Sequence, residues 1–318
     1  MNLIKRAMRD VFIETLTDRM IDDDRLFFLT ADFGSPALDG LKELCGNRFI
    51  NVGIAEQNLI NVATGLALEG YILYAYAIAP FITMRCFEQI RINLSMLSQI
   101  KKININLIGV GAGCSYDVSG PSHHCLEDII IMRMLPNIDV FSPSDYVLAS
   151  KYIDYTIEKC NPKYLRFDAK PLPAIYKPED VNIKKGFFYL REGKKICIIS
   201  TGYMTHVALE VTDHFKKEGA DIGLIDFFSF KNFDVISILE LLREFETIIT
   251  IEEGFIHHGG MDSIIADLIL DSHLNVKLFR LGMHDKYTFD LGNREHIHKI
   301  NGLGNLEIIE LIKTNLAI

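Results

Sequence analysis

Short β-branched and aromatic runs alternate with segments of helical period along most of the chain, and this alternation limits the fold more than any other feature. The runs "RLFFLTA" at 25–31, "YILYAYAIA" at 71–79 and "ININLIGVG" at 103–111 predict strands, whereas residues 81–100 and 144–160 predict helices. Strands that alternate with helices form mostly parallel sheets whose faces the helices cover. The sequence therefore predicts an α/β fold.

The alternation is interrupted in the middle of the chain. Residues 168–193 contain three prolines and mixed charge, a composition typical of a linker. A second alternating set begins with "KICIISTG" at 195–202. We therefore expect two doubly wound domains, one at 1–175 with a mostly parallel sheet and a smaller α/β domain at 193–318, joined by a linker at 176–192.

Composition and charge exclude several classes of function. The 318 residues carry a formal net charge of −9 without a basic run, which argues against nucleic acid as a partner. No apolar run reaches the roughly 18 residues of a membrane helix, and the first residues lack the apolar stretch of a secretory signal. The six cysteines form no C-x-x-C pair, so neither a zinc site nor a disulfide framework is indicated. We expect a cytoplasmic protein whose partners are small molecules or other proteins.

One carboxylate stands at the start of an apolar predicted helix, in "NVGIAEQNLINVATG" at 51–65. Positions i+4, i+7 and i+11 from Glu56 are Ile60, Ala63 and Ala67, so the carboxylate lies on the apolar stripe. A carboxylate in the first turn of a helix also interacts favourably with the helix dipole, and this interaction is worth roughly 0.3–1 kcal/mol. An unpaired buried carboxylate costs several kcal/mol, so Glu56 should take up a proton or hold a partner. On this pattern alone, a functional role and a structural role of Glu56 are about equally supported.

A second informative stretch, "GVGAGCSYDVSGPSHH" at 109–124, combines glycines with two histidines. The glycines at 109, 111 and 113 have the spacing G-x-G-x-G and lead into a loop, which does not fit a dinucleotide-binding turn. His123 and His124 precede a predicted helix on the carboxyl side of a strand, where open parallel sheets bind ligands. The loop is therefore a candidate ligand site.

These motifs together resemble the transketolase family of thiamine diphosphate enzymes. "VGIAEQN" is similar to the motif of the family's pyrimidine-binding domain, and "GPSHHCLEDIIIMRMLPNIDVFSPSD" is similar to its "GPTHQ" segment. The resemblance runs from about Arg9 to the C-terminus and assigns the second half to the transketolase C-terminal domain. It implies a transferase that moves a two-carbon ketol unit between sugar phosphates. It also implies that Glu56 bonds the ring nitrogen of the cofactor's aminopyrimidine and activates the cofactor by sharing its proton.

The resemblance implies further site residues. Phe81 would stack on the aminopyrimidine, and Asp32 would lie near the cofactor or cap the turn that follows it. His123 would act as a catalytic and substrate-binding histidine. Arg166, with Arg9 and Ser35, would bind the substrate phosphate, because a guanidinium fork meets two phosphate oxygens.

The chain departs from the family pattern in lacking any "GDG", the motif that with a following asparagine holds the magnesium ion and the cofactor's diphosphate. The resemblance therefore implies the C-terminal subunit of a split transketolase. A separate N-terminal subunit would hold most of the diphosphate and the Mg²⁺ or other divalent cation, in an active site between subunits of a heterotetramer. We expect no metal ligands in this chain.

A second departure concerns the substrate. The family motif usually reads "GEDGPTHQ", with an aspartate that recognises a hydroxyl beside the substrate carbonyl, and Ser119 stands at that position in "YDVSGPSHH". A hydroxyl bonds more weakly than a carboxylate, so the usual pentose and heptose phosphates are not favoured. The donor and acceptor sugars stay open, with a specialised sugar as one alternative.

Three alternatives stay open beside the split transketolase. Two are other thiamine enzymes: the β subunit of a 2-oxo-acid dehydrogenase, and a relative of deoxyxylulose phosphate synthase. The third is a non-catalytic assembly subunit that keeps the fold.

Overall fold

The computed structural model describes residues 4–316, which form two compact units. The first unit contains the chain up to Ala112 together with Ile131–Val181. The second unit contains the chain from Asn182 onward together with Gly113–Ile130. The loop of "GPSHH" thus groups with the C-terminal half of the chain, although its sequence position lies within the expected first domain.

The first unit is built on a six-stranded sheet with the order β3-β2-β4-β5-β7-β6. Every neighbouring pair in it is parallel, which confirms the prediction from alternation. The central strands β4 and β5 are nearly fully buried because helices cover both faces of a parallel sheet. Its strands are β2 Leu26–Thr30, β3 Phe49–Asn51, β4 Ile72–Ile78, β5 Asn104–Val110, β6 Asp139–Phe141 and β7 Lys163–Phe167.

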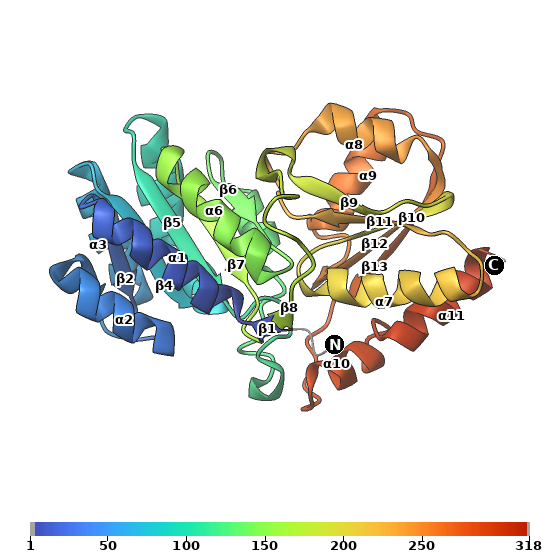
Figure 1. Cartoon of the computed structure of the whole chain (residues 1–318), viewed down its shortest axis with the longest axis horizontal. Helices are drawn as coiled ribbons and strands as arrows, with labels where there is room; N and C mark the ends of the chain where they lie inside the picture. Colours follow the sequence, from blue (N-terminus) through green and yellow to red (C-terminus); the bar gives the residue numbers. More distant parts are fainter. Residues whose placement is uncertain (1–3, 317–318) are drawn as a thin grey trace. The chain divides into compact units, whose positions relative to one another are not determined.

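The helices around this sheet include α1, α2 and α6, which lie on one side of it in Figure 1. β1 Lys5–Arg6 and β8 Leu172–Pro173 form a separate two-stranded antiparallel sheet. The helices are α1 Met8–Asp22, α2 Pro36–Cys45, α3 Glu56–Leu68 and α6 Tyr146–Glu158, with α5 Asp128–Arg133 at the boundary of the units and the 3-10 turn η1 Gly46–Arg48 before β3.

The segment 81–100, expected as one helix, consists of four short pieces. Two of them are π-helical, η2 Phe81–Arg85 and η3 Ile90–Met96, and they flank α4 Phe87–Gln89. A 3-10 turn, η4 Leu97–Gln99, ends the segment. π-Helical turns are rare and occur often at functional sites, so the side chains of η2 are candidates for such a site.

The second unit has a five-stranded sheet with the order β13-β12-β10-β11-β9. All its pairs are parallel except that of the edge strand β9, which runs antiparallel to β11 and comes from the segment expected as a linker. The strands are β9 Phe187–Arg191, β10 Lys195–Ser200, β11 Gly223–Phe227, β12 Phe245–Phe255 and β13 Lys277–Met283.

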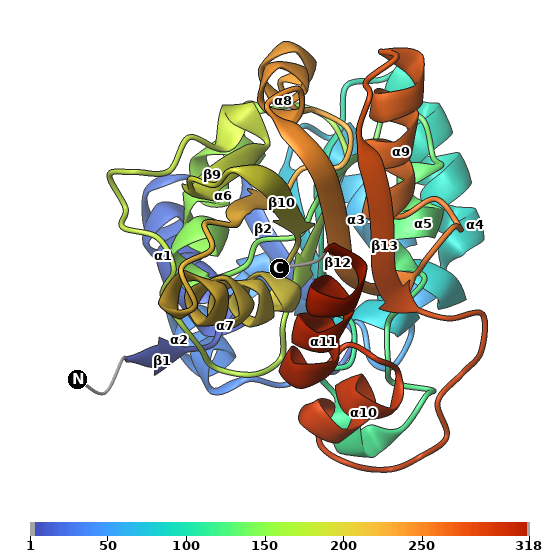
Figure 2. The ribbon, with the colours of Figure 1, turned by 90° about the vertical axis from the view of Figure 1, so that its right-hand side faces the viewer.

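Helices cover both faces of this second sheet. In Figure 1, α8 and α9 lie on one face and α7 and α11 on the other, and Figure 2 shows α7 and α11 side by side. No helix within residues 4–316 is long and apolar enough to cross a membrane. The helices are α7 Tyr203–Lys217, α8 Val235–Leu242, α9 Met261–Asp271, α10 Arg294–Ile300 and α11 Asn305–Leu316, with 3-10 turns η5 Asp117–Ser119 and η6 Ile183–Lys185.

Candidate cofactor and substrate site

Glu56 is the first residue of α3 and points into the first unit, as its place on the apolar stripe predicts. Only 3% of the residue is exposed, and the next residues on the same face, Ile60 and Ala63, are fully buried. The N-cap residue of α3, Ala55, offers no side-chain hydrogen bond. The carboxylate is therefore not a cap turned toward solvent but a charge placed inside an apolar face.

The partner of Glu56 is Arg85, which sequence reasoning did not identify. Arg85 Nη1 donates to Glu56 Oε2 at 2.8 Å, and no other side-chain hydrogen bond or ion pair of Glu56 occurs among the described residues. The Arg85 side chain keeps 47% of its surface exposed, against 4% for Glu56. Gln57 Nε2 donates to the carbonyl oxygen of Arg85 at 3.2 Å, so the backbone of η2 is tied to the first turn of α3.

Phe81 belongs to the same cluster. Its ring centroid lies 4.6 Å from the guanidinium carbon of Arg85, and both residues come from η2. The structure thus brings together the carboxylate and the aromatic ring that the family resemblance assigns to the aminopyrimidine.

A buried thiol lies next to the cluster in the chain. Cys86, which follows Arg85, is fully buried, and burial raises the pKa of its thiol to about 12, with the Glu56 charge acting in the same direction. The Arg85 guanidinium, a flat group with N–H donors, contacts both the Glu56 carboxylate and the Phe81 ring. Glu56 and Phe81 therefore fit a planar, nitrogen-bearing ring such as an aminopyrimidine.

Arg9 and Ser35 are brought together through a shared carboxylate. Arg9 Nε donates to Asp10 Oδ1 at 2.7 Å, and Ser35 Oγ donates to the same oxygen at 3.0 Å. Ser35 is also the N-cap of α2, where its hydroxyl accepts from the Ala37 amide. Arg9 and Ser35, both predicted to bind phosphate, thus each donate a hydrogen bond to Asp10 within this chain.

Asp32 joins the loops that follow β2 and β3. Asn51 Nδ2 donates to Asp32 Oδ1 at 2.9 Å, while Asn51 Oδ1 accepts from the amides of Asp32 and Gly53 at 3.1 and 2.9 Å. Both residues line a pocket of about 520 Å³, together with Ser35 and Lys42. The pocket lies at the carboxyl ends of two parallel strands, where sheets of this kind bind ligands.

Arg166 lies in β7, opposite Gly109 in the register with β5. Only 3% of the residue is exposed. A side chain this enclosed can bind a phosphate only from within the protein interior, so the structure gives Arg166 a buried position rather than an open one.

His123 and Ser119 lie in the second unit, on the loop 113–124. His123 is half-buried, and its Nδ1 lies 3.1 Å from Ser122 Oγ. Ser119 is exposed at the end of η5. His124 is buried, with Nε2 3.2 Å from the Asp117 carbonyl oxygen, so the second histidine of the pair holds the loop together.

A buried charge cluster anchors this loop within the second unit. Asp117 Oδ2 accepts from the backbone N–H of Arg294 at 3.1 Å. The Arg294 guanidinium donates from Nε to Glu253 Oε1 at 2.7 Å and makes a second bond from Nη2 to Oε2 of the same carboxylate. His298 Nε2 lies 2.5 Å from Glu253 Oε1. The Arg294 guanidinium carbon is also 3.6 Å from the centroid of the Tyr203 ring.

The electrostatics of the cluster favour a charged Glu253. Burial by itself raises the pKa of this carboxyl, but the charges and hydrogen bonds of Arg294 and His298 outweigh burial and hold the pKa far below its usual range. Gly113 approaches the carboxylate so closely that a Cβ there would lie 2.0 Å from Glu253 Oε2, and its φ of +57° also favours glycine. The start of the loop is therefore fitted to the charge cluster.

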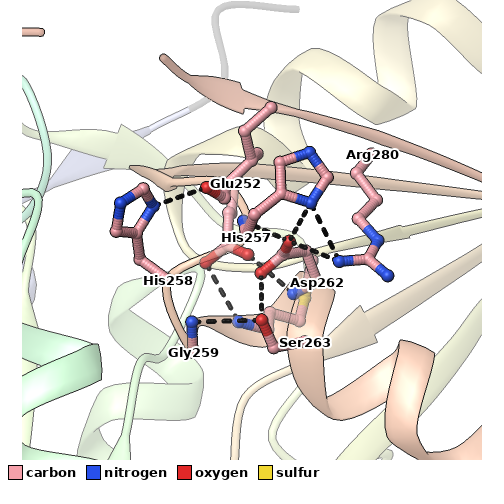
Figure 3. Close-up of polar contacts among 9 residues, drawn as sticks. Glu252, His257, His258, Gly259, Asp262, Ser263 and Arg280 are labelled. Atoms are coloured by element: carbon pink, nitrogen blue, oxygen red, sulfur yellow. Dashed lines mark hydrogen bonds and ion pairs between the residues drawn. The ribbon is translucent and has the colours of Figure 1, made fainter. Parts of the chain in front are cut away.

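The turn after β12, shown in Figure 3, is held by two further buried carboxylates. Glu252 accepts from the amides of Met261 and Asp262 at 3.1 and 2.7 Å, at the N-terminus of α9. Asp262 Oδ2 accepts from the amide of His257 at 2.7 Å, and Arg280 Nη1 lies 3.0 Å from His257 Nδ1. These contacts tie the turn to α9 and β13.

The polar groups of this turn bind one another. A Cβ at Gly260 would lie 2.7 Å from Glu252 Oε2, so the glycine permits the close approach of this carboxylate to the backbone. No group of three or more His, Cys, Asp or Glu side chains within residues 4–316 is arranged to hold a metal ion.

Comparisons with known proteins agree on one family. Residues 4–173 match the transketolase pyrimidine binding domain, and residues 188–304 match the transketolase C-terminal domain. A putative transketolase C-terminal section of Methanocaldococcus jannaschii is 31% identical over 313 residues, covering 97% of this chain and 96% of the relative. A subunit of the apulose-4-phosphate transketolase of Actinobacillus succinogenes is 29% identical over 265 residues, covering 83% and 84%. Among solved structures, a split gene transketolase described as an inactive beta4 tetramer superposes with a TM-score of 0.85 at 27% identity, covering 99% of both chains.

Proposed function

The chain belongs to the transketolase family, and we propose that it is the C-terminal subunit of a split, thiamine-diphosphate-dependent transketolase that transfers a two-carbon ketol unit between sugar phosphates. The observation that carries the proposal is the buried carboxylate of Glu56 beside the ring of Phe81, both in contact with one planar group. The pyrimidine-binding domain of this family implies dependence on thiamine diphosphate.

Glu56 has the surroundings that a proton-sharing carboxylate needs. The residue is 3% exposed and its neighbours on the same helix face, Ile60 and Ala63, are fully buried, so the carboxylate side of its hydrogen bond with Arg85 is shielded from water. In the proposed role Glu56 bonds the ring nitrogen of the aminopyrimidine, and Phe81 orients the ring by stacking. When bound, thiamine diphosphate supplies the nucleophilic carbon that carries the two-carbon unit. Positioned proton transfer of this kind is typically worth about 10²–10⁴ in rate.

The remaining site residues bind the sugar phosphate in this proposal. His123 acts on the substrate hydroxyls from the anchored loop of the second unit, with Ser119 beside it on the same loop. In this proposal the Arg166 guanidinium donates to the substrate phosphate. Arg9 and Ser35 donate to the same phosphate after they release their present acceptor, the Asp10 carboxylate. Asp32 and its pocket lie near the cofactor.

A partner subunit completes the proposed enzyme. It holds the diphosphate and the Mg²⁺ or other divalent cation, and the two chains assemble as a heterotetramer that works in the cytoplasm. Two relatives support this division: one is named as a single subunit of a transketolase, and the split gene transketolase that superposes on 99% of this chain is described as an inactive beta4 tetramer.

Calorimetry with thiamine diphosphate and magnesium tests the split. The partner to use is a chain of roughly domain size that carries "GDG" and a downstream asparagine, and finding its reading frame next to that of this chain would support the split. The chain by itself should bind the cofactor weakly or not at all, and the mixture with the partner should bind it tightly. Tight binding by the isolated chain would contradict the proposal.

Activity assays separate the alternative reactions. Release of an aldose phosphate from a ketose phosphate donor is expected of a transketolase. Decarboxylation of a 2-oxo acid would favour one of the other two thiamine enzymes, the dehydrogenase or the relative of deoxyxylulose phosphate synthase. An assembly subunit without a catalytic role would leave turnover unaffected by loss of the Glu56 carboxylate.

A further inference from the structure

We infer that Arg85 acts as an internal stand-in for the aminopyrimidine, holding this half of the cofactor site closed until the cofactor displaces it. The inference rests on the proposed function, because it concerns the same Glu56 and Phe81. Nothing in the sequence motifs or in the comparisons assigns a role to Arg85.

The contacts of Arg85 coincide with those assigned to the ring. The family resemblance gives the aminopyrimidine two contacts in this chain, a hydrogen bond with Glu56 and stacking on Phe81. The Arg85 guanidinium makes both, donating to Glu56 Oε2 at 2.8 Å and lying 4.6 Å from the Phe81 ring centroid. A guanidinium is planar and carries N–H donors at its edge, so it is the side chain most similar to a protonated aminopyrimidine. Arg85 and the ring therefore compete for the same carboxylate and the same aromatic side chain.

The stand-in is able to leave. Nearly half of the Arg85 side-chain surface, 47%, is exposed, so the guanidinium can turn into water without a large desolvation change. The backbone need not move with it, because Gln57 Nε2 donates to the Arg85 carbonyl oxygen and ties η2 to α3. Displacement thus requires rotation of one side chain.

The contact also explains how an empty site tolerates Glu56. A buried carboxylate without a partner is strongly unfavourable, and the guanidinium supplies the counter-charge while the cofactor is absent. The same contact lowers the apparent affinity for the ring, because only the fraction of molecules with Arg85 turned away can bind. We expect this competition to weaken aminopyrimidine binding by about tenfold.

Titration of the full-length chain with thiamine tests the inference, with binding followed by calorimetry. Thiamine carries the aminopyrimidine but no diphosphate, so the half-site alone can be measured. Arg85→Ala should bind thiamine about tenfold more tightly than the wild type. Arg91→Ala is the matched control, because Arg91 has a similar exposure of 46% and pairs with Glu88 instead of Glu56. That variant should bind as the wild type does.

A second variant guards against a folding defect. Arg85→Gln keeps an N–H for Glu56 but removes the charge, so it should also bind more tightly than the wild type even if Arg85→Ala is unstable. Unchanged or weaker thiamine binding by both variants would overturn the stand-in role. Absence of binding by both variants at millimolar thiamine would also overturn it, because removal of the Arg85 guanidinium should open the half-site.

The proposed function is judged by a different result. If Arg85→Ala and the wild type bind thiamine equally, and Glu56→Ala abolishes that binding, the stand-in role is wrong while the assignment of Glu56 stands. If Glu56→Ala binds as tightly as the wild type, the assignment of Glu56 itself is contradicted.

Discussion

Each unit contains a buried glutamate paired with an arginine, and the two pairs are built differently. Glu253 is 4% exposed and receives two bonds from Arg294 and a contact from His298, and the Arg294 side chain is itself only 6% exposed. Glu56 is 3% exposed and has a single bond from Arg85, whose side chain is 47% exposed. One pair is enclosed on both sides, whereas the other is enclosed on the carboxylate side only.

The difference separates a permanent contact from an exchangeable one. A buried carboxylate whose oxygens are all bonded by buried partners has no capacity left for a ligand, and breaking it leaves charges uncompensated. A buried carboxylate with one half-exposed partner can exchange that partner for a ligand at low cost. On this reasoning Glu253 anchors the loop of His123, and Glu56 is available for chemistry.

Removal of Glu253 should have the largest effect on stability. Glu253→Ala leaves Arg294 and His298 buried without a counter-charge, which is expected to lower the free energy of unfolding by about 3–5 kcal/mol. Denaturant unfolding measures this. The matched control is Glu246→Ala, because Glu246 pairs with Lys195 at the surface and should contribute less than about 1 kcal/mol. A loss below about 1 kcal/mol for Glu253→Ala, within the range of a surface pair, would mean that the enclosed pair is not an anchor.

A low pH should remove part of the stability that the Glu253 carboxylate contributes. The pKa of Glu253 is lowered in the folded chain, so its contribution is present above the pKa of an unfolded glutamate, about 4.3, and is lost as the pH falls below that value. The difference in unfolding free energy between the wild type and Glu253→Gln should therefore narrow as the pH falls from about 5 to about 3. Denaturant unfolding at a series of pH values measures it, and a difference that stays constant over this range would show that Glu253 has no such shift.

The Glu56–Arg85 pair should respond asymmetrically. Arg85→Ala leaves a buried carboxylate without its partner and should cost about 1–3 kcal/mol, whereas Glu56→Ala releases a half-exposed guanidinium to water and should cost less than about 1 kcal/mol. Unfolding of the two variants side by side measures the asymmetry. Equal losses would indicate that this pair is enclosed in the same way as Glu253 and Arg294.

The features that could be predicted from the sequence are those that arise from the residue periodicity of a single strand or helix. Alternation identified the parallel sheet of the first unit, and the 3.6-residue period placed Glu56 on the inner face of α3, because both patterns arise within one element. Arg85 was missed because its partner Glu56 lies 29 residues earlier in the chain, on another element. The available signal was its position four residues after Phe81, since a regular helix over 81–100 places these two side chains on one face.

What the sequence could not predict depends on distant contacts. The loop 113–130 groups with the second unit because Asp117 bonds to Arg294, 177 residues later in the chain, and because Gly113 packs on Glu253. β9 was not recognised within the expected linker, because the short run Phe187–Arg191 does not reveal its antiparallel pairing with β11, which lies more than 30 residues later in the chain.

Turnover of the reconstituted two-subunit complex tests the central claim most directly, with the wild type compared with Glu56→Ala at saturating thiamine diphosphate and Mg²⁺. We predict that loss of the carboxylate lowers the rate of ketol transfer by about 10²–10⁴, while the melting temperature of the chain changes little. A Glu56→Ala complex that turns over as fast as the wild type would contradict the assignment of Glu56.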